Sequence, residues 1–286
     1  MTGRWRAALW LAAVLLAALA LAACGDDDDD GGSGGGSGSG GGGGASQQAD
    51  LELHTEGQLT IGAEFPVKGF LELPIDNPKG FEVDFADAIA EELGVPKVQW
   101  VSTPFNGLFS PAPKDFDMAI NEVTITEERS QVVDFSVPYF DANQGFLIKK
   151  GGPAEGVTSI AEMKDLLFGF QTATTGGDFI NEQIQPNEDP RQFTTLGAAA
   201  QALANGQIDA FLMDVAIGAE IVKERPDDVD MTGQFVTNEQ YGVVFEKGNS
   251  LREPVNEAIE KIKADGTLEE LQAKWFPGSE DLPELK

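Results

Sequence analysis

Two segments of the chain share one pattern, FDMAINEV at residues 116–123 and IDAFLMDV at residues 208–215. In each segment an acid stands five residues after the first aspartate, so that Glu122 corresponds to Asp214. If both segments are buried strands, these acids lie just beyond the carboxyl ends of equivalent strands, where open α/β sheets bind their ligands. Two similar lobes that face each other would bring both acids into one cleft.

The rest of the folded part alternates short apolar runs with helix-like segments, which is typical of an α/β protein with mostly parallel strands. We expect strands at 59–63, 97–101, 116–120, 145–148, 167–170, 208–213 and 241–245. Phe85, Ile89 and Leu93 recur at helical spacing and Gly94 follows them, which predicts a helix over 84–93. Capping boxes predict further helix starts at Ser159 with Glu162, Ser250 with Glu253, and Thr267 with Glu270.

The first 23 residues are typical of a bacterial signal peptide. Arg4 and Arg6 precede an apolar run over 7–23 that is short for a transmembrane span and charged on one flank. This run ends in Leu21-Ala22-Ala23-Cys24, which resembles the lipobox of bacterial lipoproteins. We therefore expect cleavage before Cys24, diacylation of Cys24, and an extracytoplasmic protein that is lipid-anchored to the cell membrane.

The residues after Cys24 predict a disordered tether. Five aspartates at 26–30 and a Gly/Ser tract that runs to Ser46 cannot bury apolar surface. Cys24 is also the only cysteine, which excludes an internal disulfide, so the folded part must be held by its core.

The charge balance excludes several classes of protein. With 19 basic and 48 acidic residues, the net charge of −29 excludes most nucleic-acid binders. The sole histidine, His54, lies near the tether, which argues against histidine-based catalysis and against a multi-histidine metal site. We expect neither a metal nor a cofactor.

A series of motifs extends over nearly all of residues 59–277: GFEVD at 80–84, TPFNGL at 103–108, TITEER at 124–129, VDFS at 133–136, PYF at 138–140, QTATTG at 171–176, IDAFLMD at 208–214, QYG at 240–242, GTL at 266–268 and KWF at 274–276. Together these motifs resemble the extracytoplasmic solute-binding proteins that serve polar amino-acid ABC transporters. The resemblance implies an α/β, two-lobe fold of the periplasmic-binding-protein-like (type II) class. Its lobes would be joined by two crossing strands, near 142–148 and 236–243, and would close on a ligand.

The resemblance also implies a division of the chain. We expect a signal peptide at 1–23, the lipidated cysteine and tether at 24–56, a first lobe from 57–145 and 239–286, and a second lobe from 146–238. The expected partners are an amino-acid ligand and the permease of an ABC transporter, and we expect a monomer.

For the ligand's charged groups, the resemblance assigns Arg129 to the carboxylate and Asp214 to the ammonium. A planar, always protonated guanidinium suits two-oxygen recognition, although without the family pattern a surface arginine would be the simpler interpretation. The hydroxyls of Thr174 and Thr175 would add donors to the carboxylate from the opposite lobe.

The resemblance assigns the other polar and apolar contacts of the ligand to further motif residues. Thr124 and the backbone near Asn121 would add polar contacts, and Gln171 belongs to the same candidate site. Phe105, and Phe65 or Phe70, would flank the ligand's apolar part, or would simply be core residues.

Three departures from the family pattern bear on specificity. Glu122 stands where a small residue is usual, Ala173 replaces a frequent glycine, and Glu127 replaces a frequent proline. A glutamate at the cleft favours a cationic amino acid such as lysine, arginine or ornithine, or a related amine. Glu64 could reinforce this preference, or either glutamate could face solvent.

Two other functions remain open at this point. A cyclohexadienyl or arogenate dehydratase-like enzyme could share the scaffold, with Glu122 as the general acid. The arginine, threonine and aspartate set is complete, however, and the sequence contains no metal signature such as His-Glu-x-x-His, so we do not expect an enzyme. A ligand-sensing lipoprotein without a transport role could also use this fold.

Overall fold

The computed structural model describes residues 51–277 and 282–286. The expected signal peptide, Cys24 and most of the expected tether lie outside the described residues. Within the described ranges, no helix is both long and apolar enough to span a membrane.

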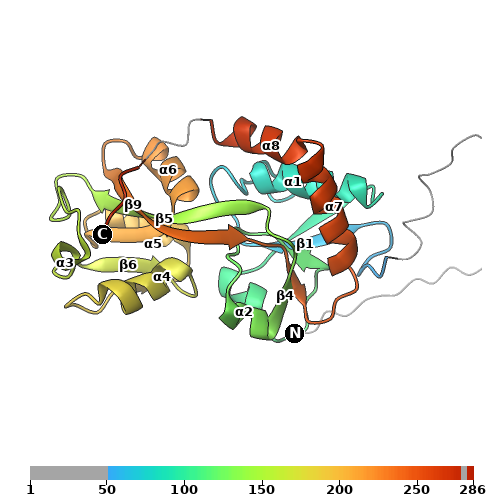
Figure 1. Cartoon of the computed structure of the whole chain (residues 1–286), viewed down its shortest axis with the longest axis horizontal. Helices are drawn as coiled ribbons and strands as arrows, with labels where there is room; N and C mark the ends of the chain where they lie inside the picture. Colours follow the sequence, from blue (N-terminus) through green and yellow to red (C-terminus); the bar gives the residue numbers. More distant parts are fainter. Residues whose placement is uncertain (1–50, 278–281) are drawn as a thin grey trace, which may run out of the picture. The chain divides into compact units, whose positions relative to one another are not determined.

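The first lobe is built on a five-stranded sheet with the strand order β2-β1-β3-β10-β4. β1 pairs in parallel with β2 and β3, and β10 pairs antiparallel with β3 and β4. Helices α1, α7 and α8 pack against one another in this lobe (Figure 1). The strands are β1 (Leu59–Ala63), β2 (Val98–Ser102), β3 (Met118–Ala119), β4 (Val133–Phe135) and β10 (Val244–Glu246); the helices are α1 (Phe81–Glu92), the 3₁₀ helix η2 (Phe105–Phe109), α2 (Glu127–Val132), α7 (Arg252–Ala264) and α8 (Thr267–Trp275).

The second lobe is built on another five-stranded sheet, with the order β7-β6-β8-β5-β9. β6 is parallel to β7 and β8, whereas β5 is antiparallel to both of its neighbours. The strands are β5 (Phe140–Lys149), β6 (Phe168–Gln171), β7 (Arg191–Phe193), β8 (Ala210–Asp214) and β9 (Val229–Tyr241); the helices are α3 (Ile160–Met163), α4 (Thr175–Phe179), the π helix η3 (Ile180–Ile184), α5 (Leu196–Ala204) and α6 (Val215–Glu224).

Two long strands, β5 and β9, connect the lobes (Figure 1). They pair antiparallel from Phe140 opposite Tyr241 to Lys149 opposite Val229, with a register shift between Ala142 and Gln144. The expected two-lobe architecture with a two-strand hinge is therefore confirmed. Both crossing strands begin before the ranges expected for them, and the expected lobe boundaries fall within these strands or beside them.

The structure confirms some of the strand and helix bounds expected from the sequence and corrects others. The strand at 59–63 is confirmed, but the expected strand at 241–245 is wrong, because β9 ends at Tyr241 and β10 begins at Val244. The helix expected from residue 84 begins earlier, at Phe81. Its N-cap, Gly80, has φ 141°, and a Cβ there would stand 1.9 Å from the carbonyl oxygen of Phe70, so only glycine fits.

Only one of the three expected capping boxes is present. Ser159 and Glu162 form a capping box at the start of α3, as expected. The Ser250 hydroxyl instead donates to Glu52 Oε2 at 2.8 Å, and α7 begins two residues later. Thr267 is the first residue of α8 rather than its cap, because Gly266 occupies the cap position with φ 89°.

The last residues pack on the second lobe, which corrects the expectation that 239–286 returns entirely to the first. Leu285 is buried in the core of the second lobe. Its side chain occupies the space where a Cβ on Gly233 would stand, and the Ile160 N–H donates to the Lys286 carbonyl at 2.9 Å.

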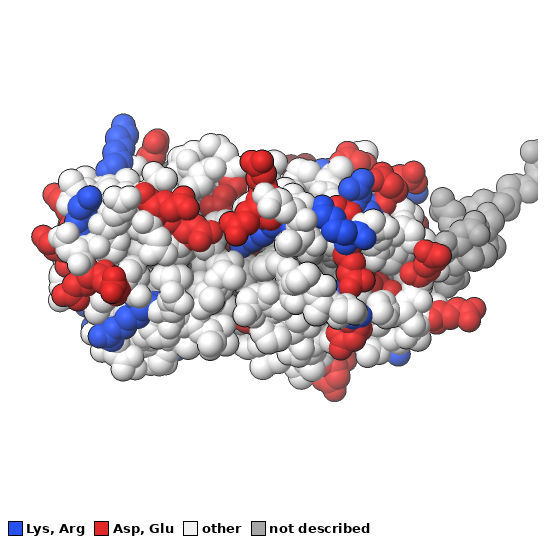
Figure 2. Space-filling view, turned by 90° about the horizontal axis from the view of Figure 1, so that it is seen from below, with Lys and Arg blue, Asp and Glu red and all other residues white. Residues whose placement is uncertain are grey.

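Acidic side chains are spread over both lobes on the face shown in Figure 2. Basic side chains on this face stand singly or in small groups among them. This surface agrees with the strongly negative net charge and offers no broad basic patch on the face in view.

Candidate ligand-binding site

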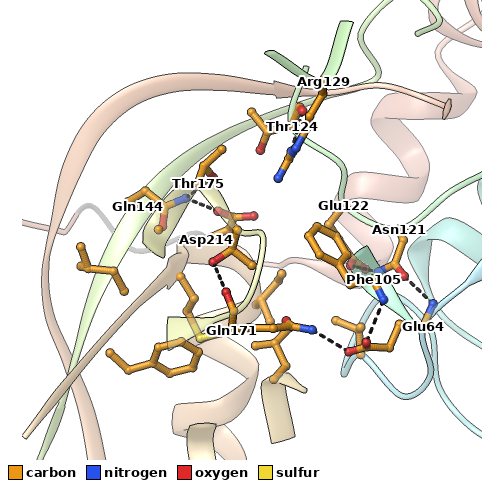
Figure 3. A pocket seen from close by; sticks show the side chains of 18 residues that line it. Glu64, Phe105, Asn121, Glu122, Thr124, Arg129, Gln144, Gln171, Thr175 and Asp214 are labelled. Atoms are coloured by element: carbon orange, nitrogen blue, oxygen red, sulfur yellow. Dashed lines mark hydrogen bonds between the residues drawn. The ribbon is translucent and has the colours of Figure 1, made fainter. Parts of the chain in front are cut away.

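A cleft that residues of both lobes line lies between the two sheets. Figure 3 shows its lining side chains converging from both sides. The predicted site residues that line it are Glu64, Phe105, Asn121, Glu122, Thr124, Arg129, Gln171, Thr174, Thr175 and Asp214. Further lining residues that the sequence did not single out are Val67, Gln144, Gly176, Leu196, Phe211, Leu212, Met213 and Ile217.

Strand topology brings the two repeated acids together. Asp214 is the last residue of β8, and Glu122 follows β3 by three residues, so one acid stands at and the other just beyond the carboxyl end of a strand in its own lobe. The residues around each acid line the same cleft.

Arg129 reaches from the first lobe to the second. It lies in α2, and its Nη1 donates to the Thr124 carbonyl at 2.7 Å within the first lobe. Its Nη2 donates to the Ala173 carbonyl at 2.9 Å, on the second lobe. The guanidinium carbon also lies 4.6 Å from the centre of the Phe109 ring. The side chain is therefore fixed in direction by contacts on three sides.

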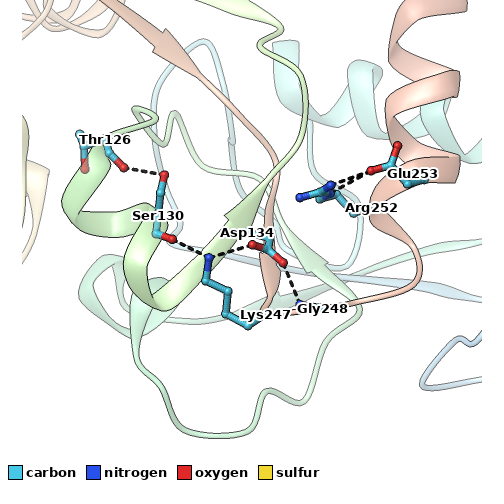
Figure 4. A network of polar contacts seen from close by, with 7 residues as sticks. All are labelled: Thr126, Ser130, Asp134, Lys247, Gly248, Arg252 and Glu253. Carbon is cyan, nitrogen blue, oxygen red and sulfur yellow. Dashed lines mark hydrogen bonds and ion pairs between the residues drawn. The ribbon is translucent and has the colours of Figure 1, made fainter.

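The helix that carries Arg129 is held in place by the return segment of the chain (Figure 4). A six-residue helix is marginal alone, so such support matters. Lys247 Nζ donates to the Ser130 carbonyl at 2.5 Å and to Asp134 Oδ1 at 2.9 Å. The Gly248 N–H donates to the other oxygen of Asp134 at 2.7 Å, and these contacts lower the pKa of Asp134.

Burial lowers the pKa of Arg129, while the charges of Asp178, Asp214 and Glu239 act in the opposite direction. A guanidinium nevertheless stays protonated at physiological pH. Arg129 therefore supplies a permanent positive charge at one side of the cleft.

Asp214 supplies the opposite charge and is held by two groups that sequence reasoning missed. Gln144 Nε2 on β5 donates to Asp214 Oδ1, and the Tyr241 hydroxyl on β9 donates to Oδ2 at 2.6 Å. Burial, and then the charge of Glu239, raise the pKa of Asp214 to about 7. Tyr241 belongs to the QYG motif, but nothing in that motif indicated its partner.

Glu239, on β9, is the third group that the sequence did not single out. Its Oε2 accepts the hydroxyl of Thr124 at 2.7 Å and that of Thr175 at 2.6 Å, and its Oε1 accepts Gln144 Nε2 at 3.0 Å. The Thr174 hydroxyl donates to the Gln171 carbonyl at 2.7 Å. The hydroxyl hydrogens of Thr174 and Thr175, expected to point at a ligand carboxylate, are thus directed to other acceptors.

Glu64 spans the lobes rather than facing solvent. Its Oε2 accepts the Phe105 N–H at 3.0 Å, and its Oε1 accepts Gln171 Nε2 from the second lobe at 2.9 Å. The Asn121 side chain in turn accepts the Glu64 N–H at 2.5 Å. These polar groups fix the wall of the cleft near β1.

Glu122 is only 5 % exposed, so the alternative that it faces solvent is wrong. Asn121 Nδ2 donates to Glu122 Oε2 at 2.6 Å, and the Glu122 N–H donates to Glu82 Oε1 at 2.7 Å. Among the described residues, Glu122 Oε1 and Glu82 Oε2 are buried without a hydrogen-bond partner. Burial, and then the charge of Glu82, raise the pKa of Glu122 well above its usual value; burial raises that of Glu82 to about 7.

Of the predicted aromatic residues, only Phe105 lines the cleft. Phe70 is fully buried in an aromatic cluster, 4.7 Å from Phe276 and 5.9 Å from Phe81 between ring centres. Phe65 packs edge-on against Trp100 at 5.6 Å. The core interpretation therefore holds for Phe70, because its ring is enclosed by other rings.

Ala173, which departs from the family pattern, stands at a position whose backbone conformation favours glycine. Ala173 has φ 67°, in the left-handed region that glycine adopts without strain. Its carbonyl accepts from Arg129, so this conformation aims a backbone acceptor across the cleft. In the described part of the chain, no group of three or more side chains is arranged to hold a metal ion.

Comparison with known proteins gives a consistent result. Residues 60–278 match the family model of the bacterial extracellular solute-binding proteins, family 3. The L-cystine-binding protein TcyJ of Escherichia coli (strain K12) is 35% identical over 200 residues, which are 69% of this chain and 74% of that protein.

Solved structures agree with the sequence matches. An ancestral arginine-binding protein bound to arginine superposes with a TM-score of 0.71 at 35% identity, covering 77% of this chain and 98% of that one. The ancestral amino acid-binding protein AncCDT-1, a precursor of cyclohexadienyl dehydratase, has a TM-score of 0.68 at 32% identity, with 77% and 95% covered.

These matches are to binding proteins rather than to enzymes, which confirms the expectation that the chain is not an enzyme. They also confirm the type II periplasmic-binding-protein class of the fold. The chain belongs to the bacterial extracellular solute-binding proteins of family 3.

Proposed function

We propose that this protein captures a free amino acid between its lobes and delivers it to the permease of an ABC transporter. The observation that carries the proposal is the placement of Arg129 and Asp214, from opposite lobes, around one cleft. Membership of an extracellular solute-binding family, and relatives named for cystine and arginine, support it.

An amino acid fits the electrostatics of this cleft. Its carboxylate pairs with the Arg129 guanidinium, and its ammonium pairs with Asp214. Both partners are needed, because burying an unpaired charge costs several kcal/mol. A ligand with both charges therefore binds, and one that lacks either binds much more weakly.

The cleft further favours a cationic side chain. Glu122 Oε1 is a buried acceptor without a partner among the described residues, and Asp214 and Glu64 line the same space. An ammonium or guanidinium offers several N–H donors to such acceptors and, as a positive charge, promotes ionisation of Glu122. Lysine, arginine and ornithine carry these groups.

We also propose that the mature protein is a monomer, held at the outer face of the cell membrane by lipid on Cys24. The lipobox-like residues 21–24 and the tether composition support this placement. Cys24→Ser is expected to release the protein into the medium or leave it unprocessed, which fractionation and metabolic palmitate labelling would detect. Equal labelling of the variant would contradict the anchor.

Arg129→Ala should abolish most of the response to amino acids. Wild-type protein at a hundredfold excess of ligand over Kd should gain about 2.7 kcal/mol of stability, read as a shift in Tm. Loss of one partner of a buried charge pair costs about 3–5 kcal/mol, or more than a hundredfold in Kd.

The matched control for Arg129 is Arg225→Ala. Arg225 Nη2 contacts only Gln201 among the side-chain hydrogen bonds of the described residues, at the surface. A thermal-shift panel of free amino acids should show a normal response for this control. A full response by Arg129→Ala would overturn the proposed clamp.

Affinity for an amino acid should rise with pH and level off above about 7. The ammonium binds the ionised form of Asp214, whose raised pKa of about 7 means that a proton must leave at lower pH. One released proton gives a slope of at most about tenfold per pH unit below the pKa. The charged and titratable groups that act on Asp214 are Glu239, Tyr241 and Arg129, and the charges of Asp214 and Glu122 also interact.

Calorimetric titrations between pH 5 and 8 measure this slope. Asp214→Asn should bind the amino acid more weakly, and its affinity should depend less steeply on pH below about 7. Asp141→Asn, on the exposed part of β5, should keep the pH dependence of the wild type. An unchanged slope in Asp214→Asn would assign the proton to another group.

Glu122→Ala tests the cationic preference. If Glu122 pairs the side chain of the ligand, the variant should lose affinity for arginine and lysine by about tenfold or more, because a charged hydrogen bond is lost. Its affinity for glutamine should change less. Calorimetry that gives the same order of ligands for variant and wild type would refute the preference.

A further inference from the structure

We propose that Glu239 is a positioning residue that makes the ammonium end of the cleft accept hydrogen bonds only. It does so by taking the hydroxyl hydrogens of Thr124 and Thr175, whose oxygens then present only lone pairs to the ligand. This inference rests on the proposed capture of an amino acid and adds to it the group that sets the direction of these hydrogen bonds.

The geometry places Glu239 behind the two threonines. Both Thr124 and Thr175 line the ligand cleft, whereas Glu239 lines a neighbouring hollow on the outer side of the same threonines. One carboxylate oxygen lies 2.7 Å from Thr124 Oγ1 of the first lobe and 2.6 Å from Thr175 Oγ1 of the second. Glu239 therefore acts on a ligand through these side chains and not by contact.

The chemistry of these groups fixes the direction of each hydrogen bond. An ionised carboxylate can only accept, and a hydroxyl has a single hydrogen to donate. When both hydroxyls donate to Glu239, neither has a hydrogen left for a ligand carboxylate. Both retain lone pairs that can accept from an ammonium, which has three N–H donors.

Gln144 is oriented by the same carboxylate. Its Nε2 donates to Glu239 and to Asp214, so its Oε1 must face the other way. That oxygen is buried without a partner among the described residues, and Gln144 lines the cleft. A Cβ on Gly176 would stand 2.8 Å from this oxygen, so glycine leaves the approach to it open.

Four acceptor groups thus surround one end of the cleft: the Asp214 carboxylate, two threonine oxygens and the Gln144 carbonyl. The side-chain hydrogen bonds of the described residues direct the available hydrogens of the threonines and of Gln144 Nε2 toward carboxylates. A ligand carboxylate would meet only lone pairs on these four side chains. This end consequently selects for an ammonium and enforces the orientation of the amino acid.

A simpler role would be a latch that joins the lobes, since Glu239 contacts a threonine from each. A latch stabilises the closed protein equally for every ligand. A residue that sets hydrogen-bond direction discriminates between ligands that differ only in the ammonium. The two roles are therefore separable by measurement.

The test compares wild type with Glu239→Gln. The glutamine has the same shape, but its amide nitrogen must donate where a carboxylate oxygen accepted. Either the two hydroxyls or Gln144 Nε2 therefore loses its acceptor, and the hydrogens of that group have to turn elsewhere. The probes are L-arginine, L-glutamine and L-cystine, each with its desamino counterpart: 5-guanidinopentanoate, 4-carbamoylbutanoate and 3,3′-dithiodipropionate. Each pair differs only in the presence of the α-ammonium groups.

We expect Glu239→Gln to lower the affinity for the amino acid that binds by about tenfold or more, the usual effect of losing a hydrogen bond to a charged group. The affinity for its desamino counterpart should change by less than about threefold on the same reasoning. Thr175→Val, which removes one acceptor without changing shape, should act in the same direction. Glu246→Gln, on β10 outside the cleft, is the control for loss of one charge and should change neither affinity.

The possible outcomes are distinct. If Glu239→Gln loses affinity equally for an amino acid and for its desamino counterpart, Glu239 acts only as a latch between the lobes. That result would overturn the inference, while the proposed function would stand. No change in either member would overturn it as well. Wild-type protein that binds none of the free amino acids in the thermal-shift panel would overturn the proposed function and, with it, the inference. If Glu239→Gln does not fold, Thr175→Val decides the question by the same comparison, the loss of affinity for the amino acid against the loss for its desamino counterpart.

Discussion

The antiparallel ladder between β5 and β9 is the constraint on which the cleft depends. These strands join the lobes, and they also carry Gln144, Glu239 and Tyr241, which hold Asp214 and the threonines in place. The register pairs Phe140 with Tyr241 and Ala142 with Glu239, and it thereby places these polar side chains where the two lobes meet. The hinge strands therefore also form a wall of the site. When they bend, the positions of the groups that orient the ligand contacts change as well.

Charge in the cleft is arranged by burial as much as by residue type. Arg129 is the permanent cation, whereas the pKa values of Asp214, Glu82 and Glu122 are raised because their surroundings exclude water. A cluster of acids can therefore exist at neutral pH without the full repulsion that the sequence suggests. Perturbed carboxyls gathered in a cleft are typical of functional sites, which agrees with the position of Asp214 and Glu122 in the lining of the cleft.

Much of the fold and the position of Asp214 could be predicted from the sequence, because strand-end acids and helix periodicity are local signals. The role of Arg129 was suggested only by the resemblance to a family, since an arginine on a short helix is by itself an ordinary surface residue. The hinge-strand groups could not be predicted: whether Glu239 faces Thr124 depends on the pairing of strands about ninety residues apart, which no local pattern encodes. The sequence could not show whether Phe70 is a core residue or a ligand contact, because aromatic residues are common in both places. Ser250 matched a capping box, yet its hydroxyl found a tertiary partner in Glu52 instead.

The two ends of the described chain belong to different lobes (Figure 1). Leu51 and Leu53 pack against a core cluster that includes β1 and α1, whereas Leu285 is buried beside Phe146 and Phe168. A rotation of one lobe against the other therefore moves residue 51 relative to residue 286. A donor and an acceptor fluorophore attached at residues 51 and 286 would convert solute capture directly into an optical signal, with no labelling of the interior.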